Sequence, residues 1–241
     1  MSERAVSTGK KSLSDNTARQ KSTAWVFAGG DFHEVCFDSA LVAVDDIIVG
    51  VDHGIEHCLA AGLVPDVIMG DFDSVDRATL DDSRLLHVKR IAYPPRKNSS
   101  DLELALEWLS EVGIARAILM GVSGGRSDHH LINWMLPLQE CWPFAIEMID
   151  ATVHALVLTP DRSFNEHAWV GQTITLVPMP EAHGVSTVGL EYALNNAHLA
   201  PGSTLGLSNI AVDETVKVSL SEGRLLVFRV NKDKMPGKLP A

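Results

Sequence analysis

Short apolar runs alternate with helix-like segments through the first half of the chain. The apolar runs cover residues 25–28, 47–51, 67–69, 85–92 and 117–121. Between them, residues 101–112 carry an apolar stripe at helical spacing, and Ser100 with Glu103 fits a capping box at its start. A second helix is expected over residues 127–139. Strands that alternate with helices in this way predict a parallel α/β sheet.

Beyond residue 150 the pattern changes to short runs that are β-branched or alternate between apolar and polar positions. These runs cover residues 153–158, 172–177, 184–187, 216–220 and 225–230, and glycine and proline turns separate them. Such strands, with almost no helical period, indicate a sandwich or a barrel. We therefore predict an α/β protein: a Rossmann-like parallel-sheet catalytic domain at residues 23–150, then an all-β sandwich domain at residues 151–235.

Residues 1–22 are polar and basic and show no apolar period. A disordered tail is expected there, because the segment lacks the apolar stretch of a secretory signal.

Composition narrows the class of protein. Apolar residues make up 46% of the chain, and no apolar run approaches the roughly 20 residues of a membrane span. Twenty basic against 31 acidic residues give a net charge of -11, which argues against a broad nucleic-acid-binding surface. The three cysteines (Cys36, Cys58 and Cys141) form no disulfide or zinc pattern, so we expect a cytoplasmic protein.

Two carboxylates follow the third apolar run directly. Asp71 and Asp73 close the segment 65–74, and ligands of open α/β sheets bind beyond such strand ends. Two like charges about 4 Å apart repel by about 4 kcal/mol at an effective dielectric constant near 20. A divalent cation relieves that repulsion, and oxygen ligands suit Mg²⁺. The alternative is a solvated turn whose aspartates cap the next helix.

Asp52 occupies the same position after the second run. The segment from His53 to His57 also reads as H-x-x-E-H, an inverted zinc-protease pattern. A crossover unit fits the preceding strand better, so we expect His57 on a partly exposed helix face and keep Asp52 as the candidate.

The loop before the capped helix carries Lys97, Ser100 and Asp101. A helix N-terminus offers free N–H groups and a positive dipole end, so this loop can hold phosphate oxygens. Asp101 can equally be a simple partner of the helix dipole.

Two glycine-containing loops follow other strands. Gly30 comes after the first run, where backbone contact with a nucleotide is expected. The segment 121–133 contains a glycine pair and then Arg126, Asp128, His129 and Asn133. Together, the four carboxylate-bearing segments predict one Mg-nucleotide site, because phosphoryl-type transfer depends on positioning and charge neutralisation.

The order of these motifs resembles the thiamine pyrophosphokinase family, which transfers a diphosphate group from ATP to thiamine and releases AMP. The resemblance covers most of residues 24–230 and rests on segments 52–55, 65–74, 97–105 and 124–133, with a similar C-terminal stretch at 185–209. It implies an α/β catalytic domain, a β-sandwich domain and a homodimer with active sites between subunits.

The resemblance also implies residue roles. Metal ligands would be Asp71, Asp73 and Asp101, and Asp52 and Asp128 would complete the catalytic acidic cluster. Cofactor contacts would be Gly30, Lys97, Ser100, Arg126 and His129, and substrate contacts would be Asn133, Ser208 and Asn209. The resemblance also implies Mg²⁺ as cofactor, ATP as co-substrate and thiamine as acceptor; neither nucleic acid nor membrane is an expected partner.

The chain departs from the family pattern at three positions in these motifs. His53 replaces the first glycine of a pair, Asn98 stands where an aspartate is usual, and Ser100 replaces a threonine. An aromatic residue that stacks on thiamine in some relatives has no clear equivalent near 226–228. These departures keep open a pyrophosphokinase with another acceptor, such as a pterin, and a catalytically weakened binding homologue. The strand followed by Asp71 and Asp73 also resembles the nucleophile motif of dehalogenase-like phosphatases, although at least two strands precede it.

Overall fold

The computed structural model describes residues 22–33 and 37–230. The predicted tail, apart from Ser22, lies outside the described residues, as do Cys36 and residues 231–235 of the predicted second domain.

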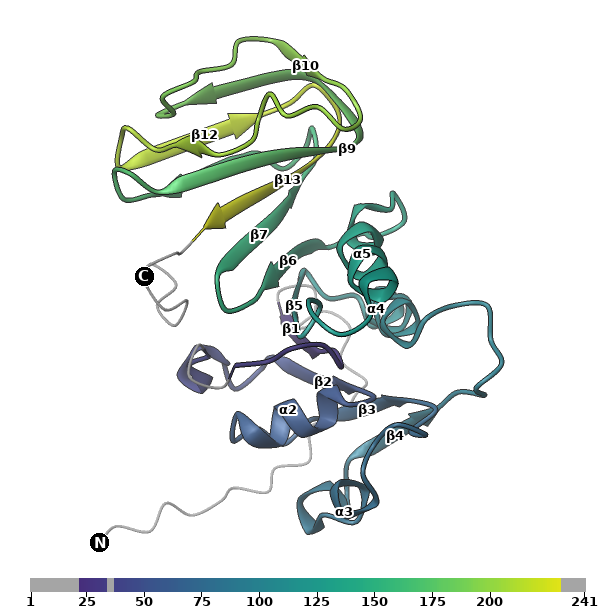
Figure 1. Ribbon diagram of the computed structural model, residues 1–241. Coiled ribbons are helices and arrows are strands. Elements are labelled where there is room, and N and C mark those ends of the chain that lie inside the picture. The colour runs from purple at the N-terminus through teal and green to yellow at the C-terminus, as the bar shows by residue number, and fades with distance from the viewer. Residues whose placement is uncertain (1–21, 34–36, 231–241) are drawn as a thin grey trace, which may run out of the picture.

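Six parallel strands form the first part of the sheet, in the order β4-β3-β2-β1-β5-β6 (Figure 1). They are β1 (Thr23–Phe27), β2 (Ile47–Val51), β3 (Val67–Gly70), β4 (Lys89–Ala92), β5 (Arg116–Met120) and β6 (Ala145–Ile149). Residues 24–27 of β1 are all buried, as expected of a strand covered on both faces.

The helices cover both faces of these strands. Leu102, Leu106 and Leu109 of α4 (Asp101–Val112) pack with Val26 of β1, whereas Cys58 of α2 (Gly54–Ala60) packs with Phe27, its neighbour on β1. Successive side chains of a strand point to opposite faces, so α4 and α2 lie on opposite sides of the sheet. The short helices are α3 (Arg77–Leu80), η2 (Ser39–Leu41) and η3 (Ser83–Leu85).

Strand order reverses at the boundary between β1 and β5. Strands β2, β3 and β4 follow β1 on one side, and β5 and β6 lie on the other. The carboxyl ends of the strands around such a switch point form the crevice in which open α/β sheets bind ligands.

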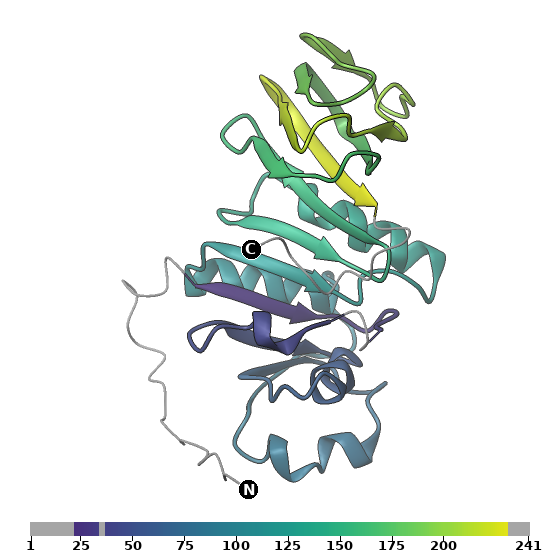
Figure 2. The ribbon, with the colours of Figure 1, turned by 90° about the vertical axis from the view of Figure 1, so that its left-hand side faces the viewer.

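The C-terminal part is rich in strands and has a core of its own. Its strands are β7 (Val153–Leu158), β8 (Phe164–His167), β9 (Thr173–Val188), β10 (Ala197–Leu199), β11 (Asn209–Ile210), β12 (Thr215–Ser219) and β13 (Glu222–Val230). They pair antiparallel, and β7 continues the sheet from β6. Figure 2 shows this continuity from the parallel strands into the β-rich part. Ile174, Val185 and Val218 are among the fully buried residues of its core.

Several predicted elements have different bounds. The runs 172–177 and 184–187 belong to one strand, β9, of 16 residues. Only 89–92 of the run 85–92 is a strand, because Leu85 is buried in a 3-10 turn that Asp82 caps. The helix predicted over 127–139 ends earlier.

That helix is α5 (Ser127–Met135), followed by the 3-10 turn η4 (Leu136–Leu138). Pro137 has no N–H to donate to an α-helix, which accounts for the tighter turn. Strands β6, β8, β10 and β11 were not predicted. In β6, Glu147 interrupts the apolar run, and it is buried because Arg116 and His154 pair with it.

Candidate active site

Asp52 stands at the end of β2, in a backbone conformation that side chains rarely adopt. Its φ is 47°, and its N–H donates to the carbonyl of Met69 on β3 at 2.9 Å. A Cβ atom on Gly70 would lie 1.7 Å from Oδ1 of Asp52, so only glycine leaves room for this carboxylate. Phe72 (φ 59°) and Ser208 (φ 54°) share this strained conformation, which is held at functional sites more often than elsewhere.

Three further charged side chains gather beside Asp52: Asp71 after β3, Lys97 in the loop before α4, and Asp101 at the start of α4. Nζ of Lys97 lies 2.8 Å from Oδ1 of Asp101 and 3.9 Å from Oδ2 of Asp71. The Asp73 N–H donates to Oδ1 of Asp71 at 3.2 Å, which fixes the turn that carries both carboxylates. The structure therefore brings Asp52, Asp71, Asp101 and Lys97 together, and Asp73 lies next to them.

Negative charge exceeds positive charge in this cluster. Burial raises the pKa of Asp52 to about 7, and the carboxylates of Asp101 and Asp71 add to that rise. Asp71 also raises the pKa of the exposed Asp73. Lys97 is partly buried, which lowers its pKa, but Asp101 and Asp71 raise it more. One ammonium thus faces four carboxyl groups.

The donor set fits a divalent cation. Oδ1 of Asp52 is buried and accepts no hydrogen bond from any described residue. A buried carboxylate oxygen without a donor is costly, and a hard cation such as Mg²⁺ satisfies it. Carboxylates are the ligands that Mg²⁺ takes together with substrate phosphates.

Ser100 caps α4, as the capping-box pattern predicts. Its Oγ accepts from the N–H of Glu103 at 3.2 Å, and α4 begins at Asp101. The hydroxyl can still donate its own proton. Asn98, the departure from the family pattern in this loop, is exposed.

The loop between β5 and α5 does not join the acidic cluster, although Asp128 was predicted to complete that cluster. Arg126 and Asp128 are exposed and pair with each other at 2.6 Å, and Arg126 lowers the pKa of Asp128 to about 2. No contact between this pair and Asp71 is found in the described chain. His129 is exposed at the start of α5. Nδ2 of Asn133 donates to the carbonyl of Val122 at 3.3 Å, which ties α5 to the loop.

Gly30 has its backbone groups engaged within the protein. The N–H of Gly30 donates to the carbonyl of Gly121 at 2.7 Å, and the carbonyl oxygen of Gly30 lies 2.8 Å from Nε2 of His57. Burial lowers the pKa of His57. This contact gives His57 a structural role and leaves the zinc-protease pattern without support.

His53 is accommodated because the second glycine of the motif is kept. A Cβ atom on Gly54 would lie 1.7 Å from the carbonyl oxygen of Phe27. His53 precedes α2 as its N-cap residue, and its Cβ lies 3.1 Å from where a Cβ on Gly29 would stand. The Cβ of His53 therefore lies against the loop that follows β1.

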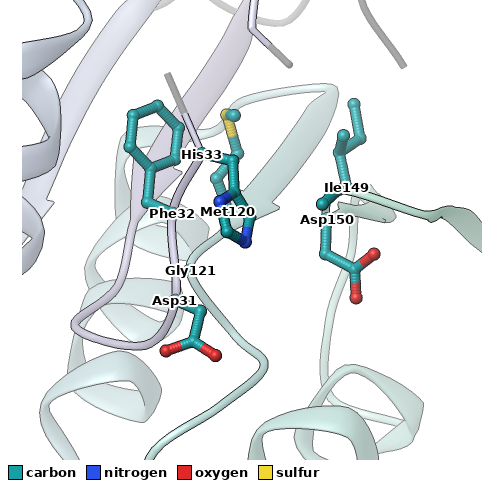
Figure 3. Close-up of a pocket in the computed structure, with 8 residues that line it drawn as sticks. Asp31, Phe32, His33, Met120, Gly121, Ile149 and Asp150 are labelled. Carbon is teal, nitrogen blue, oxygen red and sulfur yellow. The ribbon is translucent and has the colours of Figure 1, made fainter. Parts of the chain in front are cut away.

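A narrow pocket opens at the carboxyl ends of β1, β5 and β6, at the switch point of the sheet. Asp31, His33, Gly121 and Asp150 are among its lining residues. Figure 3 shows the carboxylates of Asp31 and Asp150 pointing to the same end of the pocket. Oδ2 of Asp150 accepts from Ser123 Oγ at 2.8 Å, which links β6 to the glycine loop.

The C-terminal candidates lie on the β-rich part. Asn209 is buried: its Oδ1 accepts from the Tyr192 N–H at 3.0 Å and its Nδ2 donates to the Tyr192 carbonyl at 2.8 Å. Ser208 is exposed, and its N–H donates to Oγ1 of Thr175 at 2.9 Å. Asn209 thus positions Tyr192, whose ring is exposed.

Sequence reasoning missed two residues that shape the site. Nδ1 of His130 accepts the N–H of Gly124 at 3.0 Å and so orders the glycine loop. The Asp31 carboxylate packs against Gly124, within 2.5 Å of where a Cβ there would stand. A Gly-Gly-Asp sequence after a strand was the available signal for Asp31; for His130, no local signal exists.

Two family models match the chain consecutively. The catalytic domain of thiamin pyrophosphokinase matches residues 39–145, and the vitamin B1 binding domain of the same enzyme matches residues 158–225. The chain belongs to the thiamin pyrophosphokinase family. Every residue of the acidic cluster lies in the first matched segment, and Ser208 and Asn209 lie in the second.

Individual relatives agree. Thiamine pyrophosphokinase of Bacillus subtilis is 33% identical over 187 residues, which cover 75% of this chain and 86% of the relative. Its crystal structure superposes with a TM-score of 0.77 at 28% identity, over 87% of this chain and 99% of the other. The enzyme from Geobacillus thermodenitrificans gives 0.75 at 26% identity, over 88% and 99%. The other readings, a different acceptor, a weakened binding protein or a phosphatase, are not favoured.

Proposed function

We propose that the protein transfers the diphosphate group of Mg-ATP to the hydroxyethyl arm of thiamine, giving thiamine diphosphate and AMP. The observation that carries this proposal is the meeting of Asp52, Asp71, Asp101 and Lys97 at one edge of the sheet, in a chain of this family. Transfer of a phosphoryl-type group needs placement and charge neutralisation, which this cluster is equipped to provide.

Asp71, Asp73 and Asp101 are proposed to hold Mg²⁺, with Asp52 completing the acidic cluster. The bound cation would neutralise charge on the phosphate oxygens and orient them. Lys97 holds Asp71 and Asp101 in place through its ion pairs and directs its positive charge to the same point.

The remaining phosphate contacts are proposed at helix starts and in the glycine loop. The first N–H groups of α4 and the Ser100 hydroxyl can donate to phosphate oxygens. Arg126 would exchange its exposed partner Asp128 for a phosphate, and His129 stands beside it. Gly30 contributes by fixing the β1 loop, because its N–H is already used.

Thiamine is proposed to bind at the β-rich part. Ser208 offers an exposed hydroxyl, and its neighbour Asn209 holds Tyr192 in place through two hydrogen bonds. Asn133 would contribute to thiamine binding from α5. Two surfaces expose large apolar side chains without cover: Tyr192, Leu205 and Leu207 here, and Leu131 and Ile132 on α5.

A homodimer with active sites between its subunits accounts for the apolar face of α5. Leu131 is 56% exposed and Ile132 51% exposed, and within the described chain α5 buries none of its residues. A helix with an uncovered apolar face indicates a partner surface. A second copy would cover that face and bring residues of two subunits to one site.

Finer features of the fold and the location belong to the same proposal. A Rossmann-like catalytic part and a sandwich-like second part are supported by the strand order and by the separate C-terminal core. A cytoplasmic location is supported by the free thiols of Cys58 and Cys141. No helix in the described chain is both long enough and apolar enough to cross a bilayer.

The test is AMP release by the purified protein with Mg-ATP, with and without thiamine, and identification of the organic product by mass. We expect AMP only when thiamine is present, together with thiamine diphosphate. A folded protein that forms no AMP with thiamine would refute the proposal, and a pterin offered in parallel would show whether the acceptor alone was misassigned.

A further inference from the structure

A second cluster of metal-binding side chains lies on the β-rich part. Glu181 and His183 stand two residues apart on β9, and His198 comes from β10. All three offer a ligand atom, and these atoms lie within 4.8 Å of one another. In the sheet, β9 is separated from β3 by β2, β1, β5, β6, β7 and β13 (Figure 1), so this cluster is distinct from the acidic site.

The strand register explains why the three side chains meet. Residues two apart on a strand share a face, which places Glu181 and His183 together. Ala197 pairs with Val185 and Leu199 with Ala182, so a bulge in β9 sets His183 and Gly184 opposite the single residue His198. The bulge brings both imidazoles to the same face of the sheet.

The distances suit a tetrahedral metal ion. Oε2 of Glu181 lies 3.1 Å from Nε2 of His198 and 3.7 Å from Nε2 of His183. Bonds of about 2.0–2.1 Å to Zn²⁺ place neighbouring ligand atoms of a tetrahedron about 3.3–3.4 Å apart. The two imidazole rings stack, with centroids 4.2 Å apart and planes 4° from parallel, so at least one ring must rotate out of the stack before both nitrogens point to one ion.

We propose that Glu181, His183 and His198 bind one divalent transition-metal ion of the Zn²⁺ type. Two imidazole nitrogens and one carboxylate oxygen select such ions over Mg²⁺, which prefers oxygen ligands. Three protein ligands leave a fourth position for water. The side chains are 40–50% exposed, so an ion can enter from solvent without any opening of the fold.

The bound ion would clamp β10 onto β9. The segment between them, residues 189–196, carries the exposed Tyr192, and one metal ion closes this hairpin at its base. Without the ion, the three residues are joined by a hydrogen bond between His198 and Glu181, by the 3.7 Å approach of His183 to Glu181 and by the stacking of the two imidazoles. Metal binding should therefore stabilise the folded chain, because a ligand that binds only the folded state shifts the unfolding equilibrium.

The test uses the full-length, metal-free protein without a polyhistidine tag. Zn²⁺ is titrated calorimetrically in the presence of millimolar Mg²⁺, and Co²⁺ is titrated as a visible-absorbing substitute. We expect one equivalent to bind, with Co²⁺ absorption typical of nitrogen ligation, and a higher unfolding temperature with Zn²⁺. His198→Ala and Glu181→Gln should each weaken binding at least about tenfold, since each removes one of three ligands.

Two controls separate this site from others. His87→Ala removes an exposed histidine outside the cluster and should leave the affinity unchanged. Asp71→Asn should also leave it unchanged; loss of Zn²⁺ binding in that variant, but not in His198→Ala, would place the ion at the acidic cluster and overturn the proposal. Lack of Zn²⁺ binding by the parent protein up to millimolar concentration would overturn it too.

A measurement on the unaltered protein covers the case in which a variant does not fold. Zn²⁺ should shift the side-chain nitrogen signals of two histidines in a nuclear magnetic resonance spectrum. Shifts in no histidine would contradict the assignment.

Discussion

Replacing Gly70 by alanine tests the geometry of the acidic cluster without removing any charge. Gly70 has a φ of 142°, and a Cβ there would lie 1.7 Å from Oδ1 of Asp52. Real Cβ contacts are essentially never shorter than 3.0 Å, so the carboxylate must retreat by about 1 Å or more. A displacement of about 1 Å can cost on the order of 100-fold in rate. We expect kcat/KM to fall by about that factor, which corresponds to about 2.7 kcal/mol.

The assay is the initial rate of AMP formation over a range of Mg²⁺ concentrations, with unfolding followed in parallel. Gly70→Ala also places alanine in an unfavourable backbone region, which costs about 1–3 kcal/mol of stability. Gly62→Ala is the matched control, because its φ is 74° and no atom of the described chain lies within 4 Å of the added Cβ. The control should lose stability but keep its activity within twofold. Activity of a folded Gly70→Ala protein within threefold of the parent would refute the reasoning.

Three further predictions concern the metal ligands, the pH dependence of stability and the dimer. Asp71→Asn should abolish AMP formation with the fold intact, whereas the exposed Asp161→Asn should not; equal activity of both would remove Asp71 from the mechanism. Burial favours protonation of Glu147, but hydrogen bonds from His154 and a neighbouring guanidinium outweigh it and hold the pKa of Glu147 below its ordinary value. That stabilisation is present at pH 7 and lost as the pH falls through the lowered pKa. Glu147→Gln should thus lower the free energy of unfolding by about 2 kcal/mol at pH 7, less than the loss expected for a fully buried ion pair, and by progressively less below about pH 4. Urea unfolding in which the difference between the two proteins stays constant with pH would contradict this. Ile132→Asp should convert a dimer to monomers in sedimentation, and a dimer that persists at micromolar concentration would exclude α5 as the interface.

Local signals predicted the elements that have clear ends. The helix at 101–112 was predicted with its observed bounds, because Ser100 caps it and Gly113 ends it in the left-handed conformation (φ 80°). The run 85–92 was wrongly predicted as one strand, because Leu85 is buried in a 3-10 turn and packs into the core from there. Similarly, β6 was missed because its buried Glu147 depends on partners from β5 and β7.

The acidic site was predictable in outline for a topological reason. Carboxylates that follow parallel strands meet at one edge, so Asp52, Asp71 and Asp101 could be placed together from the sequence. The same reasoning placed Asp128 with them, which is wrong, because Asp128 is exposed and pairs with Arg126. Contacts between distant segments could not be predicted. The close approach of Gly70 to Asp52 depends on the register between β2 and β3. Likewise, His183 and His198 form no sequence motif and meet only through the bulge in β9.

The central claim is transfer of an intact diphosphate group from ATP to thiamine at the acidic site. ATP labelled at the β-phosphorus tests it directly, because that atom leaves with the transferred group. With Mg²⁺ and thiamine, the account predicts that the label appears in thiamine diphosphate while the released AMP is unlabelled. Labelled ADP with thiamine monophosphate, or label that reaches thiamine equally well in Asp71→Asn, would contradict it.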